Sequence, residues 1–316
     1  MNESIHNSHD KGFKYLFGIK RLFVQLLRSF VQQDWAQRIL PGDVELVDKS
    51  FILPDFKHKE ADLVYKIKMD GNYVYFYLLE LQSSVDFQMP YRLLLYMIEI
   101  WRTVLKDTNS KEAKRKDYKL PVIVPCVLYN GDDKWTVARS FRETLARYEE
   151  FDEFVLDFKY ILFDVRRYND DDLLELANVI GATFFIDKTT DKEKDLLERL
   201  VIMAKRIQEL SSDDIDVLWV WIKNISTIGL TNDMECEIEE FILQERTVEN
   251  LVYGVERVMK RERFEAKLEG KAEGKVEEQI KIAKEMIIDN EPMEKILKYT
   301  KIPLAEIQKL AKEIGH

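Results

Sequence analysis

The sequence predicts an α+β protein whose elements run helix, three strands, helix, strand, followed by a mostly helical C-terminal region. Residues 60–82 form two strand patterns around an Asp-Gly pair, apolar residues recur at helical spacing before and after them, and the predicted elements beyond residue 166 are all helical. Such a chain is expected to form a mixed sheet whose faces are covered by helices.

The first helix is predicted from residue 10 to about residue 31. Asp10 can cap it, and apolar side chains follow at steps of three and four: Phe13, Leu16, Phe17, Leu22, Phe23, Leu26, Leu27, Phe30 and Val31. Pro41-Gly42 then breaks the chain, and residues 44–53 form a first, partly alternating strand.

The next two strands form a hairpin, residues 60–68 and 73–82. Asp70-Gly71 between them favours a two-residue turn with positive φ. The second strand is almost continuously apolar and aromatic, which indicates burial on both faces, yet it ends in Glu80 and Gln82.

A second helix is predicted over residues 87–106, because its apolar residues form one broad face. Residues 106–119 hold six basic and three acidic side chains and are expected to form an exposed loop. Residues 120–129 form a buried strand that ends at the turn Asn130-Gly131-Asp132-Asp133.

The remaining elements are a short helix at 141–148, a strand at 155–165, and helices at 170–180 and within 191–227. Residues 234–289 form one long helix or two joined ones, in which Gly270 and Gly274 predict a hinge or a lightly packed linker. Residues 290–316 form two short helices around a turn at 300–303, a unit of helix-turn-helix size.

Composition excludes several classes of protein. No apolar run reaches membrane-spanning length and residues 1–10 are polar, so neither a membrane protein nor a signal peptide is expected. Cys126 and Cys236 are far apart, which suits the cytoplasm and excludes a cysteine-based zinc site. The net charge is −10, but residues 1–150 hold 23 basic against 21 acidic side chains, so nucleic-acid binding by this half is permitted.

The chemistry is expected at one end of the hairpin. Glu80 and Gln82 lie two residues apart in a strand pattern and therefore point to the same face, and Asp62 lies on the partner strand at the same end. Carboxylates on two adjacent strand ends suit Mg²⁺, which takes few protein oxygens and leaves other positions to water and phosphate.

At this point the sequence resembles a known family. The spacing Asp62 … Glu80-x-Gln82 is similar to the PD-(D/E)xK nuclease signature, with glutamine in place of the usual lysine. Further segments support the resemblance in order: His9-Asp10-Lys-x-Phe13-Lys14, Ala61-Asp62-Leu63-Val64-Tyr65, Leu79-Glu80-Leu81-Gln82-Ser83 and Met89-x-x-Arg92-Leu-Leu-x-Tyr96. Together, over about residues 9–250, they resemble the Rpn recombination-promoting nucleases, also described as putative transposases of the YhgA-like group.

The resemblance implies a restriction-endonuclease-like core and a Mg²⁺- or Mn²⁺-dependent endonuclease that cuts DNA, associated with recombination or mobile elements. Asp62 and Glu80 would be the metal ligands, and Gln82 would take the position of the catalytic lysine. A neutral amide can hydrogen-bond to water but cannot neutralise developing charge. Slower chemistry is therefore expected, unless Lys14, Arg92 or Tyr96 supports the site.

The expected organisation is a nuclease core at 10–165, a helical extension at 166–230, a charged helical segment at 231–289 and a tail at 290–316. Two alternatives stay open: a weak or inactive nuclease fold that binds DNA or oligomerises, and a strand-transferring transposase. The helical C-terminal region is the expected site of homodimer formation. Its tail, residues 291–315, has an excess of only one positive charge, which is poor support for a DNA reader.

Overall fold

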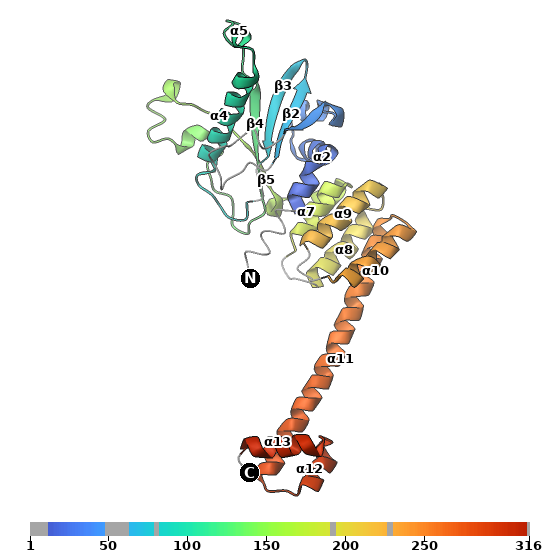
Figure 1. Cartoon of the computed structure of the whole chain (residues 1–316). Helices are drawn as coiled ribbons and strands as arrows, with labels where there is room; N and C mark the ends of the chain where they lie inside the picture. Colours follow the sequence, from blue (N-terminus) through green and yellow to red (C-terminus); the bar gives the residue numbers. More distant parts are fainter. Residues whose placement is uncertain (1–11, 48–62, 79–81, 190–193, 226–229, 315–316) are drawn as a thin grey trace. The chain divides into compact units, whose positions relative to one another are not determined.

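The computed structural model describes residues 12–47, 63–78, 82–189, 194–225 and 230–314. Its centre is one sheet of five strands in the order β1-β2-β3-β4-β5: Val44–Val47, Leu63–Met69, Asn72–Leu78, Val122–Tyr129 and Ile161–Asp164 (Figure 1). β1, β2 and β3 are antiparallel, whereas β4 runs parallel to β3 and β5 parallel to β4. The predicted α+β class, with a mixed sheet and a helical C-terminal region, is confirmed.

The hairpin of β2 and β3 turns where the sequence predicts. Met69 pairs with Asn72, and the two residues between them have positive φ, 48° at Asp70 and 82° at Gly71. Both values suit the mirror-image turns that match the twist of paired strands. The register then places Leu63 opposite Leu78 at the other end of the hairpin.

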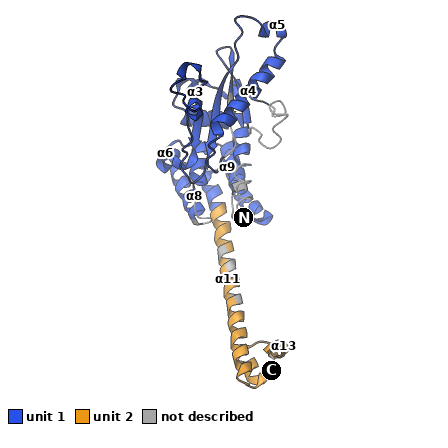
Figure 2. Ribbon diagram, turned by 90° about the vertical axis from the view of Figure 1, so that its left-hand side faces the viewer, with its two compact units in different colours: residues 1–254 blue, residues 255–316 orange. Residues whose placement is uncertain are grey.

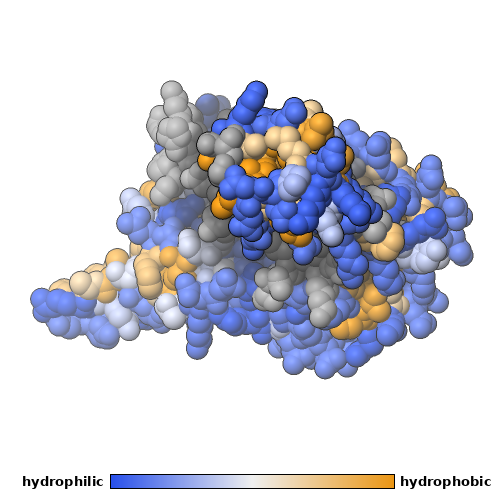
Figure 3. Space-filling model, turned by 90° about the horizontal axis from the view of Figure 1, so that it is seen from below, coloured by the Kyte–Doolittle hydropathy of each residue, from blue (hydrophilic) through white to orange (hydrophobic). Residues whose placement is uncertain are grey.

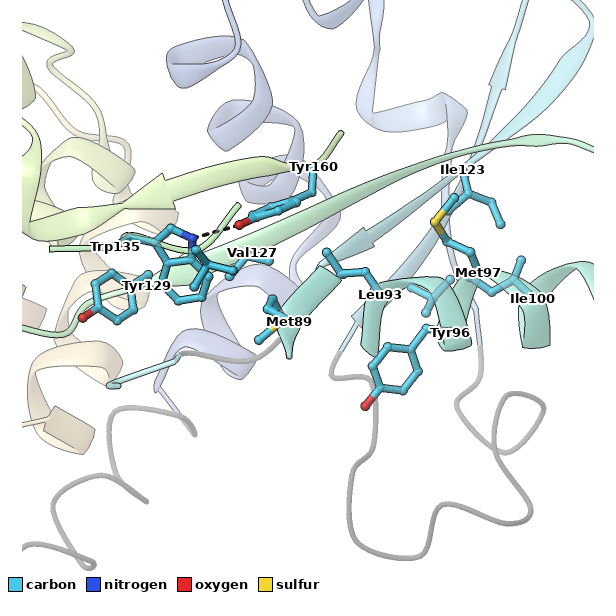
Figure 4. Close-up of a cluster of buried hydrophobic side chains, with 12 residues drawn as sticks. Met89, Leu93, Tyr96, Met97, Ile100, Ile123, Val127, Tyr129, Trp135 and Tyr160 are labelled. Atoms are coloured by element: carbon cyan, nitrogen blue, oxygen red, sulfur yellow. Dashed lines mark hydrogen bonds between the residues drawn. The ribbon is translucent and has the colours of Figure 1, made fainter. Parts of the chain in front are cut away.

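One face of the sheet is covered by α4, Met89–Asp107. Its Met89, Leu93, Met97 and Ile100 pack in one buried cluster with Val64 of β2 and with Ile123, Val127 and Tyr129 of β4 (Figure 4). Trp135 and Tyr160 extend the cluster beyond the strands, joined by a hydrogen bond of 2.8 Å from Trp135 Nε1 to Tyr160 Oη.

The opposite face is covered by the N-terminal helices. Tyr65 follows Val64 along β2, so its ring points to the other side of the sheet. It stacks on Phe23 of α2, Lys20–Phe30, with ring centroids 4.1 Å apart, and its hydroxyl donates to the Phe17 carbonyl. The predicted single helix is interrupted at Ile19, whose extended conformation separates helical residues 12–18 from α2.

Short α-helices and 3-10 helices lie in the segments that connect these strands and helices. They are α3 (Asp34–Arg38), η1 (Pro41–Asp43), α5 (Ser110–Ala113), η3 (Phe141–Thr144), η4 (Asp152–Phe154) and η5 (Val165–Arg167). The segment 106–119, predicted as an exposed loop, contains the end of α4 and the one-turn helix α5, and most of its side chains are exposed.

The helix predicted over 170–180 is divided in the structure into α6 (Asp170–Glu175) and α7 (Val179–Asp187). Ala177 adopts a φ of 46°, and Asn178 then caps α7 by accepting a hydrogen bond of 2.9 Å from the Gly181 N–H. The helices approach each other so closely that a Cβ on Gly181 would overlap the Leu173 carbonyl oxygen. This tertiary contact explains the break.

Three further helices, α8 (Lys194–Arg206), α9 (Ser212–Ile225) and α10 (Asn232–Gln244), complete the first of two compact units, residues 1–254 (Figure 2). Trp221 of α9 is fully buried and meets the Phe13 ring edge-on, with centroids 5.8 Å apart. The second unit, residues 255–316, contains most of α11 (Val248–Ile288), α12 (Met293–Thr300) and α13 (Leu304–Ile314).

The second unit has its own small core. Ala283 and Ile287 of α11 pack with Ile296 of α12, Ile302 of the turn, and Ile307, Leu310 and Ala311 of α13. The predicted pair of short terminal helices is therefore present. α11 continues as a helix through Gly270 and Gly274, where a hinge or a linker was predicted, and both glycines face open space.

No helix in the described ranges is long and apolar enough to cross a bilayer. Hydrophilic side chains dominate the surface seen in Figure 3, and hydrophobic ones appear there in small separate groups.

Candidate functional site

The candidate site lies at the edge of the sheet where the parallel strands β3, β4 and β5 end. Gln82 lies beyond the end of β3 and still pairs with β4: its N–H donates to the Leu128 carbonyl at 3.0 Å, and its carbonyl accepts from the Asn130 N–H at 3.1 Å. Tyr129 is the partner of Gln82 on one side and of Asp164 on the other. Gln82, Tyr129 and Asp164 thus form one row across three strand ends.

Asp62 and Glu80, the two predicted metal ligands, lie outside the described residues. Their nearest described neighbours in sequence are Leu63 and Leu78, which pair with each other. Leu63 follows Asp62 directly, and Leu78 precedes Glu80 by two residues. Directly paired residues of antiparallel strands lie about 5 Å apart. The assignment of Asp62 and Glu80 stays a prediction.

The register changes by one residue along β4. Leu78 pairs with Cys126 and Gln82 pairs with Tyr129, so four steps on the first chain segment correspond to three on the second. The alternation expected of an unbroken strand cannot be carried through such a change. Glu80 lies between these two pairs and outside the described residues, and the shared face of Glu80 and Gln82 stays a prediction.

Arg92 and Tyr96 are brought together on α4, as their four-residue spacing predicts. Arg92 donates to Asp86 Oδ2 at 2.7 Å, and its side chain is only 16% exposed. Burial lowers the pKa of the Arg92 guanidinium, but hydrogen bonds to Asp86 and Tyr96 outweigh it and raise the pKa above its usual value. Arg92 thus joins the connecting segment 83–88 to α4 by an ion pair, in which Asp86 neutralises the Arg92 charge.

Lys14 is half-buried on the helical segment 12–18. This segment lies against β2, because the Phe17 carbonyl accepts the Tyr65 hydroxyl. Lys14 therefore lies on a helical segment that packs on β2, whose first described residue is Leu63.

Asn130 and Gly131 have a larger role than the turn that the sequence indicates. The Asn130 side chain is buried and its Nδ2 donates to Asp187 Oδ2 of α7 at 3.2 Å, while its carbonyl accepts from Arg166 Nε at 2.7 Å. Gly131 lies against the Ser83 backbone, and a Cβ there would be 2.5 Å from the Ser83 oxygen. These contacts fix the loop after β4 against the segment that contains Gln82.

Asp164 is a functional candidate that the sequence reading missed. Its Oδ1 is buried and meets no hydrogen-bond donor in the part of the chain that the structure describes. Burial raises the pKa of Asp164 above its usual range, although Arg167 and Arg139 act in the opposite direction. An aspartate next to the last residue of the strand predicted at 155–165 was the available sequence signal.

Within the described ranges, no group of three histidine, cysteine or acidic side chains is placed to hold a metal ion. The row contains one side-chain amide, that of Gln82, and one carboxylate, that of Asp164, while the Tyr129 hydroxyl donates to the Asp133 carbonyl. The amide and carboxylate oxygens are both of the hard type that Mg²⁺ accepts. The donor chemistry of the edge therefore fits this ion, and the two carboxylates needed to hold it would be Asp62 and Glu80.

The structure is that of an α+β protein with one mixed sheet. Polar side chains, those of Gln82 and Asp164, lie at the carboxyl ends of its parallel strands. The chain belongs to the family described as "Putative transposase, YhgA-like", whose sequence pattern matches residues 7–217. The match confirms the resemblance found in the sequence and extends from the N-terminal helix into α9, so it includes the whole sheet and α4. No curated protein and no solved structure matches this chain.

Proposed function

We propose that the protein is a metal-dependent endonuclease that hydrolyses phosphodiester bonds in DNA at the carboxyl edge of its sheet. Asp62 and Glu80 hold the ion, and Gln82 orients the attacking water. Family membership supports a mobile-element-associated DNA function, and the backbone pairing of Gln82 with Leu128 and Asn130 at the strand ends is the observation that carries the site. Plasmid nicking in Mg²⁺, Mn²⁺ and Ca²⁺ tests the activity.

Bound Mg²⁺ would polarise the phosphodiester and lower the pKa of its bound water. The chain's own contribution is positional. Gln82 can donate and accept hydrogen bonds, so it can orient a water molecule, but it carries no charge. Arg92, predicted as a supporting cation, is paired with Asp86 at 2.7 Å, so a role beside Gln82 would be shared with this ion pair.

Replacing Gln82 by lysine is expected to speed DNA cleavage about tenfold, because a fixed cation at the site of charge development can contribute a kcal/mol or more to the transition state. Single-turnover nicking rates measure the effect. The matched control is Gln88→Lys, which adds the same charge at an exposed position before α4. An unchanged or lower rate for Gln82→Lys, with normal folding and DNA binding, would argue against this role for position 82.

The alternative of a weak or inactive nuclease fold predicts a different binding result. Isothermal calorimetry on an inactive fold would show no Mg²⁺ or Mn²⁺ binding that depends on Asp62. A strand-transferring transposase would instead join a labelled DNA end to a target duplex, which a strand-transfer assay detects directly.

Removal of residues 270–316 is expected to abolish dimer formation and leave DNA affinity unchanged. A chain ending at Glu269 lacks every residue of the small core formed by Ala283 to Ala311. That unit exposes large apolar side chains, among them Met293 at 42%, Tyr299 at 66% and Leu304 at 44%, which suits a protein partner. Light scattering and fluorescence anisotropy measure the two properties; lost DNA affinity with an unchanged mass would indicate a DNA-binding tail.

A further inference from the structure

A basic groove of about 560 Å³ lies beyond the ends of β4 and β5. Its four cations come from three elements: Arg166 and Arg167 from η5, Lys188 from the end of α7, and Arg199 from α8. The other lining residues are Asp132, Asn169, Asp170 and Asp171. All of these positions lie within the part of the chain that matches the family.

Backbone carbonyl groups hold three of these cations in place. Arg166 Nε donates to the Asn130 carbonyl at 2.7 Å, Lys188 Nζ to the Tyr168 carbonyl at 2.6 Å, and Arg199 to the Phe185 carbonyl at 3.1 Å. The side chains of all three are about one-fifth exposed or less. Their charged ends are therefore ordered before any ligand arrives, which lowers the entropic cost of binding an anion.

The groove carries more positive than negative charge. Asp170 pairs with both Lys188 and Arg199, and Asp132 pairs with Arg166 at 3.2 Å. Arg199 also pairs at 3.5 Å with Asp195, which does not line the groove. Asp171 instead pairs with Arg206, which does not line the groove.

Four cations and three carboxylates therefore line the groove, an excess of one positive charge. Arg167 is exposed, donates to the Asp132 carbonyl at 2.6 Å, and forms no ion pair within the ranges that the structure describes. It is the cation most available to an incoming anion.

The groove adjoins the candidate site. The carbonyl that accepts Arg166 belongs to Asn130, whose N–H donates to Gln82, so two hydrogen bonds connect Arg166 with Gln82. Ligands of open sheets with parallel strands bind outside the carboxyl ends of those strands. A DNA strand at the end of β3 would therefore continue past the ends of β4 and β5.

We propose that the groove formed by Arg166, Arg167, Lys188 and Arg199 binds phosphate groups of the DNA backbone next to the bond that is cut. Guanidinium groups match phosphate oxygens in two-point hydrogen bonds, and three of the four cations are arginines. The inference rests on the proposed nuclease function, and it assigns that function a substrate-positioning surface remote in sequence from Asp62 and Glu80.

The test is fluorescence anisotropy of a labelled duplex over a series of salt concentrations, with the full chain and without divalent metal. Arg167→Ala is expected to weaken binding severalfold and to reduce the slope of log affinity against log salt by about 1. Arg167→Lys should keep the slope and Arg167→Glu should reduce it further. The matched control is Arg102→Ala on α4, an arginine 69% exposed and paired with Glu99, which should bind as wild type.

Wild-type slopes for both Arg167→Ala and Arg167→Glu would overturn the inference. Because binding is measured without metal, this result does not depend on cleavage. If Asp62→Ala lost cleavage while the Arg167 variants kept wild-type slopes, the nuclease function would be supported. Only the phosphate-binding role of the groove would then be contradicted.

Discussion

Replacing Asp62 or Glu80 by alanine is expected to lower the rate of DNA cleavage at least about a hundredfold, the usual loss when a group that stabilises developing charge is removed. Each carboxylate is predicted to supply one of the few protein oxygens that hold Mg²⁺. The measurement is single-turnover plasmid nicking across Mg²⁺, Mn²⁺ and Ca²⁺.

A matched control separates this effect from a general change of charge. Asp117→Ala removes an exposed carboxylate, 69% exposed and paired with Arg115, from the segment that follows α4. It should cut DNA as wild type. Calorimetry on the same proteins should show that the Asp62→Ala variant no longer binds the metal ion, whereas the Asp117→Ala variant still does. Cleavage at the wild-type rate by folded Asp62→Ala and Glu80→Ala proteins would show that the site has been misassigned.

Gly131→Ala is expected to cost about 1–3 kcal/mol of stability, the usual range for overpacking a closely packed position. The added methyl group would overlap the Tyr129 hydroxyl and lie 2.5 Å from the Ser83 carbonyl oxygen. Since the obstacle includes backbone, relief requires the loop after β4 to move away from residues 82–84. Thermal unfolding should shift down by several degrees, and DNA cleavage should fall with it because Gln82 is displaced.

Gly42→Ala is the control for this substitution, because nothing lies within 4 Å of the added methyl group. It should change neither the unfolding temperature nor the cleavage rate. If Gly131→Ala behaved in the same way, the close approach between the two loops would not be needed for the site.

The elements that the sequence predicts correctly are those fixed by local patterns. The hairpin follows from Asp70-Gly71, whose residues adopt the positive φ values that the turn needs. α4 follows from its apolar periodicity, since Met89, Leu93 and Met97 all reach the sheet. The helix breaks at Ile19 and Ala177 were not predicted. The break at Ala177 depends on a tertiary contact, the close approach of α6 and α7 at Gly181.

The candidate site divides in the same way. Gln82 was singled out from its spacing, and the structure shows its backbone paired with Tyr129 at the strand ends, while its catalytic role stays a prediction. The groove of Arg166, Arg167, Lys188 and Arg199 was not identified, because its members are brought together only by the packing of η5, α7 and α8. No short motif joins residues that lie this far apart in sequence.

The mixed sheet also has a consequence for the order in which the candidate site forms during synthesis. The β2–β3 hairpin joins neighbouring segments and can form within microseconds. The parallel pairs β3–β4 and β4–β5 join distant segments and must pay for loop closure first, so they form late. Gln82 pairs with Leu128 and Asn130 at the end of β4, so a nascent chain whose residues 122–130 are still inside the ribosome would lack this part of the candidate site.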